Sequence, residues 1–288
     1  MMNRIQCLRH CREMLSTTRR SLVSLSQTEV VSEKPEVIGA NMCAVRKPSF
    51  CIQSYDMPKE NDLYQPWRIH KLVKKSDVIQ AQALIYDVYV REMGWMFAKN
   101  NPTGFRIEKS DCGKSLLTDD LEDHSNWFGV FEEDRVVAVA RRVHRNAQGH
   151  LDLTRYESSK KPQIARAVCP VNNEYVYEIQ RCAIAKEYRG TNVIMCVFHY
   201  LFLNAAMNNF SIVGTSPVGK MKSFLLSTLR LRAIDHNFLY SENLEGPSTV
   251  FHLTVEEGLR ASDILEEKIL KRRQRQPRAR DTLRQQQC

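Results

Sequence analysis

The sequence lacks the cysteine and histidine spacings that hold a structural metal ion. Its nine cysteines are scattered, none forms a Cys-x-x-Cys pair, and no histidine cluster joins them at zinc-like spacing. An odd number of dispersed cysteines is also unlike the framework of a disulfide-rich secreted domain. The pattern predicts no metal site and favours a reducing compartment such as the cytoplasm.

Long apolar runs are equally scarce. Residues 193–207 are apolar nearly throughout, but this run is shorter than the ~20 residues that a membrane-spanning helix needs. It also contains the polar residues His199 and Asn204. The run therefore predicts a helix that is buried against a sheet, and no membrane span.

The positive charge of the chain is concentrated at one end. The formal net charge is +9, yet residues 268–288 alone carry eight Lys or Arg residues and one acid, Asp281. The rest of the chain is nearly balanced, which is unlike a nucleic-acid-binding body. No aromatic residues alternate with the basic ones to stack on bases. We expect a solvated tail and no nucleic-acid partner, although the tail could steer an acidic carrier protein by long-range attraction.

Residues 1–62 are predicted to be an extension and linker. The first 28 residues contain five arginines, one acid and many Ser and Thr residues, a composition typical of an organelle transit peptide. A disordered leader, or a start codon placed too far upstream, explains this composition equally well. We expect a folded domain over residues 63–256 and a charged helix with a basic tail over residues 257–288. The expected compartment is the cytoplasm, or an organelle matrix if residues 1–30 are a transit peptide.

The folded region is predicted to alternate strands and helices, because apolar residues recur there with period two or with helical spacing. Ser76 is expected to cap the first helix, and residues 97–118 are expected to form a long irregular loop that covers a site. In chain order, the predicted elements are a strand at 67–73, a helix from 76 to near 94, a hairpin at 126–131 and 136–143, a strand at 175–185, a helix at 193–207, a strand at 210–215, a helix at 218–229, strands near 237–240 and 249–254, and a helix at 256–275.

The strand predicted at 175–185 contains two charges of opposite sign, Glu178 and Arg181, in a segment that otherwise resembles a core strand. Burying charge is costly unless the charge is paired or used. Residues three apart in a regular strand point to opposite faces, so bringing both to one site would take a β-bulge, a device common beside active sites. A structural ion pair near the strand end is an equally good interpretation of these two residues alone.

Acidic and aromatic side chains elsewhere are further candidates for binding. The stretch Asp119-Asp-Leu-Glu-Asp123 concentrates acid just before the hairpin, either as a solvated loop or as a pocket for a cationic or amine substrate. Trp95, which follows the first helix, is either a core plug or part of a ligand pocket.

The order of these elements and motifs resembles the GNAT acyltransferase superfamily over roughly residues 67–255. Within it, the chain is most similar to the acyl-homoserine-lactone synthases and the N-acyl amino acid synthases. The motifs that carry the likeness are Arg91-Glu-Met-Gly-Trp95, Asp120-x-x-Asp123, Ala140-Arg141 and Glu178-x-x-Arg181, in which Gln180 replaces the serine of the family's signature. The resemblance implies an α/β fold, a three-layer α/β/α sandwich around a mixed central sheet with splayed fourth and fifth strands.

The resemblance also implies a transfer of a fatty acyl group to a small amine, either S-adenosylmethionine or an amino acid. Glu178 would be the base that deprotonates the amine and Arg181 would order the acyl donor. Asp120 and Asp123 would hold the ammonium group of the acceptor. Arg141 would brace them or bind a carboxylate, and Trp95 would wall the pocket. Backbone N–H groups of the splayed fourth strand would hold the thioester oxyanion, and the apolar faces of residues 193–207 and 210–215 would accept the acyl chain.

The chain departs from the superfamily at the loop that cradles the donor phosphate. Where acetyl-CoA enzymes have Arg-Gly-x-Gly-x-Gly, this chain has Arg189, Gly190, Thr191 and Asn192, followed by Val193 and Ile194. The missing glycines argue against tight coenzyme A binding, because they let backbone N–H groups approach a pyrophosphate. An arginine of the family also corresponds to Ile85 here.

The expected donor is therefore an acyl-phosphopantetheine, on a carrier protein in preference to coenzyme A. It serves as a co-substrate, and no cofactor is expected to be tightly bound. Two alternatives are an acetyl-CoA-dependent amine N-acetyltransferase and a GNAT-like module that binds a partner without catalysis.

Overall fold

The computed structural model describes residues 62–97, 99–101, 103–144, 151–156, 160–168, 175–217, 219–239 and 247–275. All of them belong to the compact unit that runs from Gln53 to Cys288. The extension predicted over residues 1–62 lies outside the described residues except for Asp62, and so does the basic tail after residue 275.

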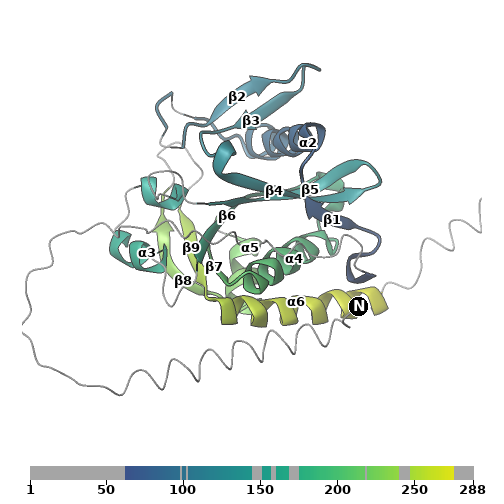
Figure 1. Cartoon of the computed structure of the whole chain (residues 1–288), viewed down its shortest axis with the longest axis vertical. Helices are drawn as coiled ribbons and strands as arrows, with labels where there is room; N and C mark the ends of the chain where they lie inside the picture. The colour runs from purple at the N-terminus through teal and green to yellow at the C-terminus, as the bar shows by residue number, and fades with distance from the viewer. Residues whose placement is uncertain are drawn as a thin grey trace, which may run out of the picture. The chain divides into compact units, whose positions relative to one another are not determined.

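One mixed seven-stranded sheet organises this unit (Figure 1). Its only parallel neighbours in the described residues are β6 and β7, which are joined through a helix; every other neighbouring pair is antiparallel. In spatial order the strands are β1 (Arg68–Lys71), β4 (Ser125–Glu132), β5 (Arg135–Val143), β6 (Tyr175–Ile184), β7 (Phe210–Pro217), β9 (Ser248–Leu253) and β8 (Arg232–Phe238).

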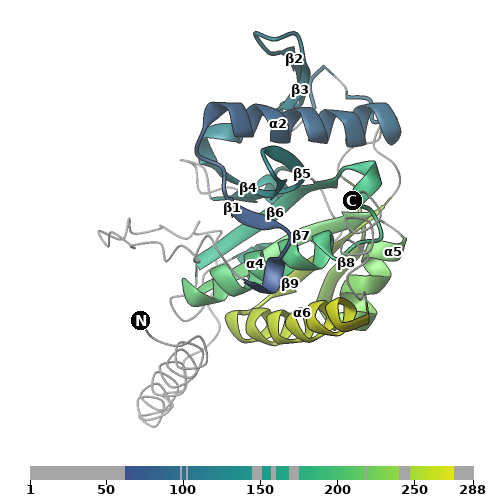
Figure 2. The same ribbon diagram turned by 90° about the vertical axis from the view of Figure 1, so that its right-hand side faces the viewer.

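Helices cover both faces of the sheet, which makes three layers (Figures 1 and 2). Helix α2 (Lys75–Ile85) lies on one face, and α4 (Val193–Met207) lies on the other with α6 (Val255–Arg275) packed against it. The predicted α/β/α sandwich with a mixed sheet is therefore confirmed. The remaining helices are short: α3 (Lys161–Val168), α5 (Lys220–Ser223), the π-helices η2 (Tyr86–Glu92) and η6 (Phe224–Thr228), and the 3-10 turns η1 (Asp62–Tyr64), η3 (Glu122–His124), η4 (Asp152–Arg155) and η5 (Lys186–Tyr188).

Helix α4 is buried almost all round because it lies between the sheet and α6. Its bounds are those predicted from the apolar run. Helix α6 supplies the outer cover with a single apolar stripe that includes Ala261, Leu265 and Ile269, while its other faces carry charge. Across the part of the chain that the structure describes, no helix combines the length and the apolar character needed to cross a membrane.

Strands β6 and β7 separate part of the way along their length. They pair with each other from Tyr175 opposite Phe210 to Ile179 opposite Gly214. Beyond this point β6 continues to Ile184 and β7 to Pro217, but the two strands no longer pair with each other. Gly214 allows the last close approach, since a Cβ atom there would lie 3.0 Å from the backbone oxygen of Ile179. The predicted splay of the two central strands is confirmed.

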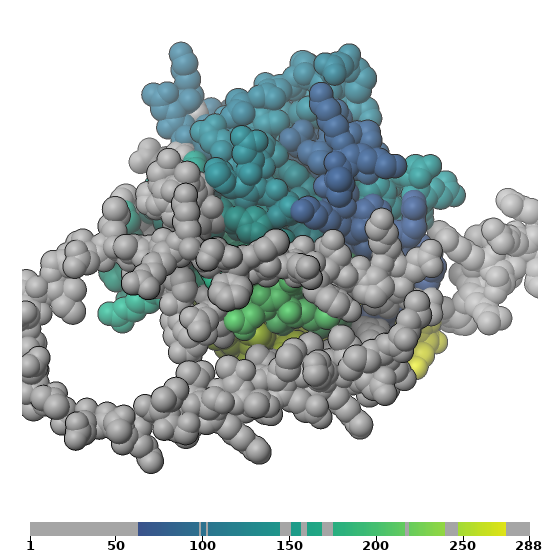
Figure 3. Space-filling view, in the orientation of Figure 1, coloured from purple at the N-terminus to yellow at the C-terminus, as the bar shows by residue number. Residues whose placement is uncertain are grey.

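The prediction of an irregular loop over residues 97–118 was wrong in part. Strands β2 (Arg106–Lys109) and β3 (Ser115–Thr118) form an antiparallel hairpin there, next to α2. Figure 3 shows the blue and teal atoms of this region on the side of the unit away from α4 and α6. The turn is closed by Ser110, whose backbone N–H bonds to Lys114 and whose carbonyl accepts from Gly113. Strands of four residues are too short to display a clear alternation in sequence.

The predicted cap of the first helix was also wrong. Helix α2 begins at Lys75, its N-cap residue is Lys74, and no side chain caps it. The hydroxyl of Ser76 instead donates to the carboxylate of Asp77. Beyond Ile85 the helix widens into the π-helix η2, which ends before Gly94, a residue with a positive φ of 70°.

Candidate functional site

A β-bulge in β6 lies where the charged pair was predicted to need one. Val139 of β5 pairs with Ala183, and Arg141 of β5 pairs with Gln180, so β6 contains one extra residue across this interval. The extra residue is accommodated at Arg181, whose φ is 53°. The bulge puts the side chains of Gln180 and Arg181 into the same polar cluster, although they are neighbours in the chain.

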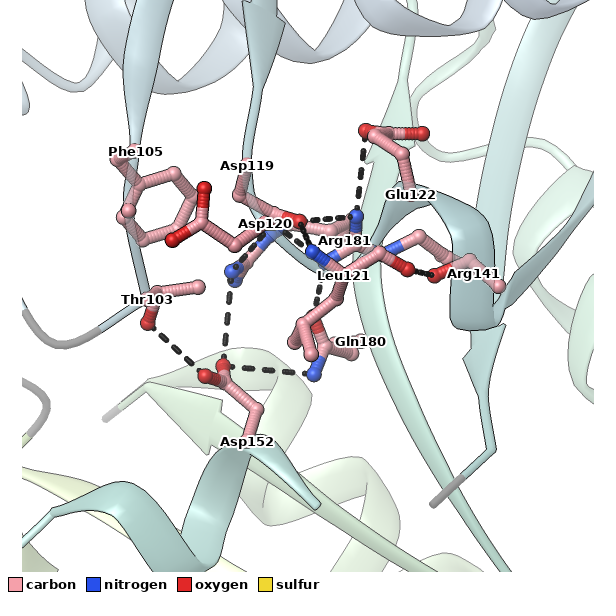
Figure 4. Close-up of polar contacts among 12 residues, drawn as sticks. Thr103, Phe105, Asp119, Asp120, Leu121, Glu122, Arg141, Asp152, Gln180 and Arg181 are labelled. Carbon is pink, nitrogen blue, oxygen red and sulfur yellow. Dashed lines mark hydrogen bonds and ion pairs between the residues drawn. The ribbon is translucent and has the colours of Figure 1, made fainter. Parts of the chain in front are cut away.

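Two buried guanidinium groups form the centre of this cluster (Figure 4). Arg141, which is 1% exposed, makes a two-pronged contact with Asp119 at 2.8 and 2.5 Å. Arg181 lies 3.2 Å from Asp119 and 3.6 Å from Asp152, and its guanidinium carbon sits 4.1 Å from the ring centre of Phe105. Both guanidinium groups therefore have fixed orientations inside the protein.

Gln180 joins the two halves of the cluster through both ends of its amide. Its nitrogen donates to Glu178 at 3.0 Å and to Asp152 at 3.4 Å, and its oxygen accepts from Arg141 at 2.6 Å. The second oxygen of Glu178 accepts from the backbone N–H of Leu153 at 3.1 Å. The amide that replaces the signature serine thus bridges an arginine and two carboxyl groups.

The carboxyl groups of the cluster differ in charge. Burial would raise the pKa of Asp119, but the positive charges of Arg141 and Arg181 outweigh it and hold that pKa at about 2. Burial, together with the neighbouring Asp152, raises the pKa of Glu178 to about 8, and burial raises the pKa of Asp152 as well. At neutral pH, Asp119 is ionised and Glu178 retains its proton.

A cavity of about 230 Å³ opens where β6 and β7 separate. Residues from both faces of the sheet line it, so it passes between the two strands. Its polar lining includes Gln180 and Arg181 from β6, Thr215 and Ser216 from β7, and Ser248 from β9, and the rest is mainly apolar. The apolar wall includes Val88, Tyr89, Met93 and Trp95 from one face and Phe198, Phe202, Leu225, Leu231, Phe251 and Leu253 from the other.

Cys182 also lines the cavity. Burial raises the pKa of its thiol to about 12, so the thiol stays protonated at neutral pH. A protonated thiol is a poor nucleophile, so we interpret Cys182 as a residue that only lines the cavity.

The structure brings together some of the predicted site residues. Arg181 and Trp95 line the cavity, and Arg141 belongs to the cluster behind it. Glu178 is fully buried and contacts Gln180, but it does not line the cavity itself. The apolar stretches predicted to accept an acyl chain contribute Phe198 and Phe202 from α4, and Ile212, Gly214 and Thr215 from β7.

The two predicted aspartates do not join the cluster. Asp123 is exposed, and Asp120 is exposed and pairs with Arg106 at 2.8 Å. Their neighbours Asp119 and Glu122 contact Arg141 instead, so the three-residue spacing is kept but begins one residue earlier. Asp119 also accepts from the backbone N–H of Leu121, a local turn that directs its side chain inward.

Sequence reasoning missed Asp152 altogether. It lies at the start of η4, outside every motif, and it is completely buried. Nothing in the local pattern marks it, because its partners are distant in the chain.

The loop before α4 lies at the end of β6. Arg189 pairs with Glu92 at 2.7 Å, and Gly190 has a φ of 82° with open space beside it. Arg272 of α6 donates to the carbonyl oxygens of Gly190 and Thr191, at 3.4 and 3.2 Å.

In the parts of the chain that are described, no group of three or more His, Cys, Asp or Glu residues is placed to hold a metal ion.

No protein-family model matches the chain, and no curated protein matches its sequence. Solved structures do match its fold. FeeM, an N-acyl amino acid synthase from uncultured soil microbes, is 12% identical with a TM-score of 0.49, over 67% of this chain and 92% of that one. The AHL synthase LasI is 13% identical with a TM-score of 0.46, over 66% and 89%. A putative N-acetyltransferase from Lactobacillus plantarum is 14% identical with a TM-score of 0.42, over 66% and 98%. An N-acyl amino acid synthase and an AHL synthase are thus among the solved structures whose fold this chain resembles.

Proposed function

We propose that the protein is an N-acyltransferase that moves a fatty acyl group from a pantetheine thioester to a small amine. The observation that carries this proposal is the mainly apolar cavity between β6 and β7, with Arg181 on its wall at the bulge. An apolar cavity that passes between two strands suits an extended hydrocarbon chain better than a polar metabolite. Its volume of about 230 Å³ accommodates on the order of ten water-sized groups.

The thioester would lie where the two strands part. Beyond Ile179, the backbone groups of β6 that face β7 have no strand partner in the described ladder. Such N–H groups are suited to hold the oxyanion that forms when an amine attacks a thioester. Arg181, fixed by two carboxylates, would order the donor beside them.

The acceptor amine must lose a proton before or during attack, and Glu178 is the proposed base. With a pKa of about 8, Glu178 is ionised in only a minority of molecules at neutral pH, and it is this ionised form that would accept the proton. Because its carboxyl group lies behind Gln180, the proton would reach it through an intervening water molecule. Trp95 would wall the acceptor side of the cavity.

The exposed carboxylates of Asp120 and Asp123 remain candidates for a first contact with the ammonium group of the acceptor. Arg141 would brace this acidic segment through its buried contact with Asp119. The acceptor proposed is S-adenosylmethionine or an amino acid, and the experiment below distinguishes them.

The proposed donor is the acyl-phosphopantetheine of a carrier protein, in the cytoplasm. The loop from Arg189 to Asn192 has only Gly190 with a positive φ, and the large side chain of Ile194 follows within the first turn of α4. A single phosphate needs fewer backbone N–H groups from such a loop than a pyrophosphate does. Coenzyme A thioesters, including acetyl-CoA, are therefore expected to be poorer donors.

The test is an acyl-transfer assay with the full chain, in which mass spectrometry detects the N-acyl product. Donors are acyl-carrier protein and acyl-CoA of several chain lengths, and acceptors are S-adenosylmethionine and a panel of amino acids. We expect product with fatty acyl-carrier protein, and a loss of about 10²–10⁴-fold in rate for Glu178→Gln. The control is Asp111→Asn, an exposed acid in the turn of the β2–β3 hairpin, which should leave the rate unchanged. Absence of product with every donor would exclude the activity, and an undiminished rate in Glu178→Gln would exclude Glu178 as the base.

A further inference from the structure

Asp152 is a completely buried carboxyl group that supports the cavity wall from outside the motifs of β6. It accepts a hydrogen bond from the hydroxyl of Thr103 at 2.9 Å, and the same hydroxyl contacts Tyr156. Its other oxygen lies 3.4 Å from the amide nitrogen of Gln180 and 3.6 Å from Arg181 (Figure 4). The amide and the guanidinium group that β6 contributes to the cavity wall, those of Gln180 and Arg181, therefore both contact this one carboxyl group.

The short helix η4 is attached to β6 by two adjacent contacts. Leu153 donates its backbone N–H to Glu178, and Asp152 reaches Gln180 two residues farther along the strand. The two carboxyl groups consequently share the amide of Gln180, which donates to each of them. This arrangement makes η4 a clamp on the segment of β6 that contains the bulge.

We propose that Asp152 is a positioning residue that holds Gln180 and Arg181 at the cavity wall and is paired with Glu178 through the amide of Gln180. The proposal deepens the acyl-transfer function and rests on it only for its kinetic consequences. The other side of Arg181 is held by Asp119 and its face by Phe105, so removing Asp152 takes away one support and leaves these two. A guanidinium that loses one support rotates without leaving the cluster.

Charge explains why the two carboxyl groups act as a pair. The groups that face them are the cations Arg141 and Arg181, the ionised Asp119, and Tyr156, whose pKa is raised by burial so that it stays neutral. The two cations already face Asp119, and Arg141 also contacts Glu122. Ionising both Asp152 and Glu178 would leave an excess buried negative charge, so they retain one proton between them at neutral pH.

The first test uses the pH dependence of stability and requires no enzymatic activity. The pKa of Glu178 is about 8 in the folded protein and near 4.5 when unfolded, so folding takes up a proton between these values. The stabilisation is fully present below the unfolded pKa and is lost as the pH rises through the folded one. Asp152→Asn removes the adjacent charge and so lowers the pKa of Glu178 in the folded protein. Between about pH 5 and pH 8, the thermal midpoint of this variant should therefore fall by at least about 3 °C less than that of the wild type.

Two further variants serve as a change in the opposite direction and as a control. Thr103→Val keeps both carboxyl groups but removes a hydrogen bond that lowers the pKa of Asp152. The thermal midpoint of Thr103→Val should therefore fall more steeply with rising pH than that of the wild type. Asp120→Asn, an exposed neighbour of the cluster, should match the wild type. Identical pH dependence in the wild type, Asp152→Asn and Thr103→Val would overturn the proposal.

The second test uses the acyl-transfer assay. A displacement of about 1 Å in a positioned group costs on the order of 10²-fold in rate, so Asp152→Asn should lower kcat by 10-fold or more and change KM little. The midpoint of its pH–rate profile should move to lower pH, which a merely structural defect would not cause. An unchanged profile would overturn the proposal. If the wild type transfers no acyl group, the proposed function fails, while the stability test still decides the role of Asp152.

Discussion

Replacing Arg141 with leucine is expected to lower the free energy of unfolding by about 3–5 kcal/mol. Arg141 is almost completely buried and makes its two-pronged contact with Asp119, which is buried as well. Without the guanidinium, Arg181 is the one charged partner that Asp119 retains among the described residues, and Gln180 loses the donor to its amide oxygen. Urea denaturation of the wild type and the variant at neutral pH measures the loss.

Matched variants separate this effect from the loss of any surface ion pair. Arg106 pairs with Asp120 at the same 2.8 Å as one arm of the Arg141 contact, but both members of that pair are about half exposed. Arg106→Leu should therefore cost less than about 1 kcal/mol. Combining Arg141→Leu with Asp119→Leu should recover part of the loss, because the buried carboxylate that made the two-pronged contact is then removed as well. Equal destabilisation by Arg141→Leu and Arg106→Leu would contradict the interpretation of the cluster as buried.

The parts of the fold that could be predicted are those with a long, regular apolar pattern. The run at 193–207 became α4 without a change in its bounds, because a helix that packs on both a sheet and another helix must be apolar on nearly every side. The hairpin of β4 and β5 follows from two strands of alternating pattern around a tight turn at Glu133. The splay of β6 from β7 entered through the family resemblance, since no residue pattern in either strand indicates where pairing stops.

The parts that could not be predicted depend on contacts between distant residues. The β2–β3 hairpin and η4 are each too short for their periodicity to show. Asp119 and Asp120 are chemically identical neighbours, and only the turn at Leu121 decides which one points inward. Asp152 contacts Thr103, Gln180 and Arg181, and none of these residues is close to it in the chain. A bulge in this strand was foreseen only as what it would take to bring Glu178 and Arg181 to one site, which is a chemical argument and not a pattern.

The cavity leads to the second large expected effect, which concerns Gly214. A Cβ atom at this position would lie 3.0 Å from the backbone oxygen of Ile179, and backbone cannot move aside as a flexible side chain does. Gly214→Val would therefore force β6 and β7 apart at their last paired residues and place two methyl groups in the cavity. We expect fatty acyl transfer to fall by 100-fold or more, and the free energy of unfolding to fall by about 1–3 kcal/mol.

Two comparisons assign that loss to the cavity. A Cβ atom added at Gly258 of α6 would have its nearest neighbour at 3.8 Å, so Gly258→Ala should leave acyl transfer intact and stabilise the helix by up to about 1 kcal/mol. Leu225→Phe narrows the cavity from the side of η6 without touching the strand pair, and it should shorten the longest acyl chain that is transferred. The measurement is the rate for a series of acyl chain lengths with each variant. If Gly214→Val and Leu225→Phe transferred long chains as fast as the wild type, the acyl chain would have to bind outside this cavity.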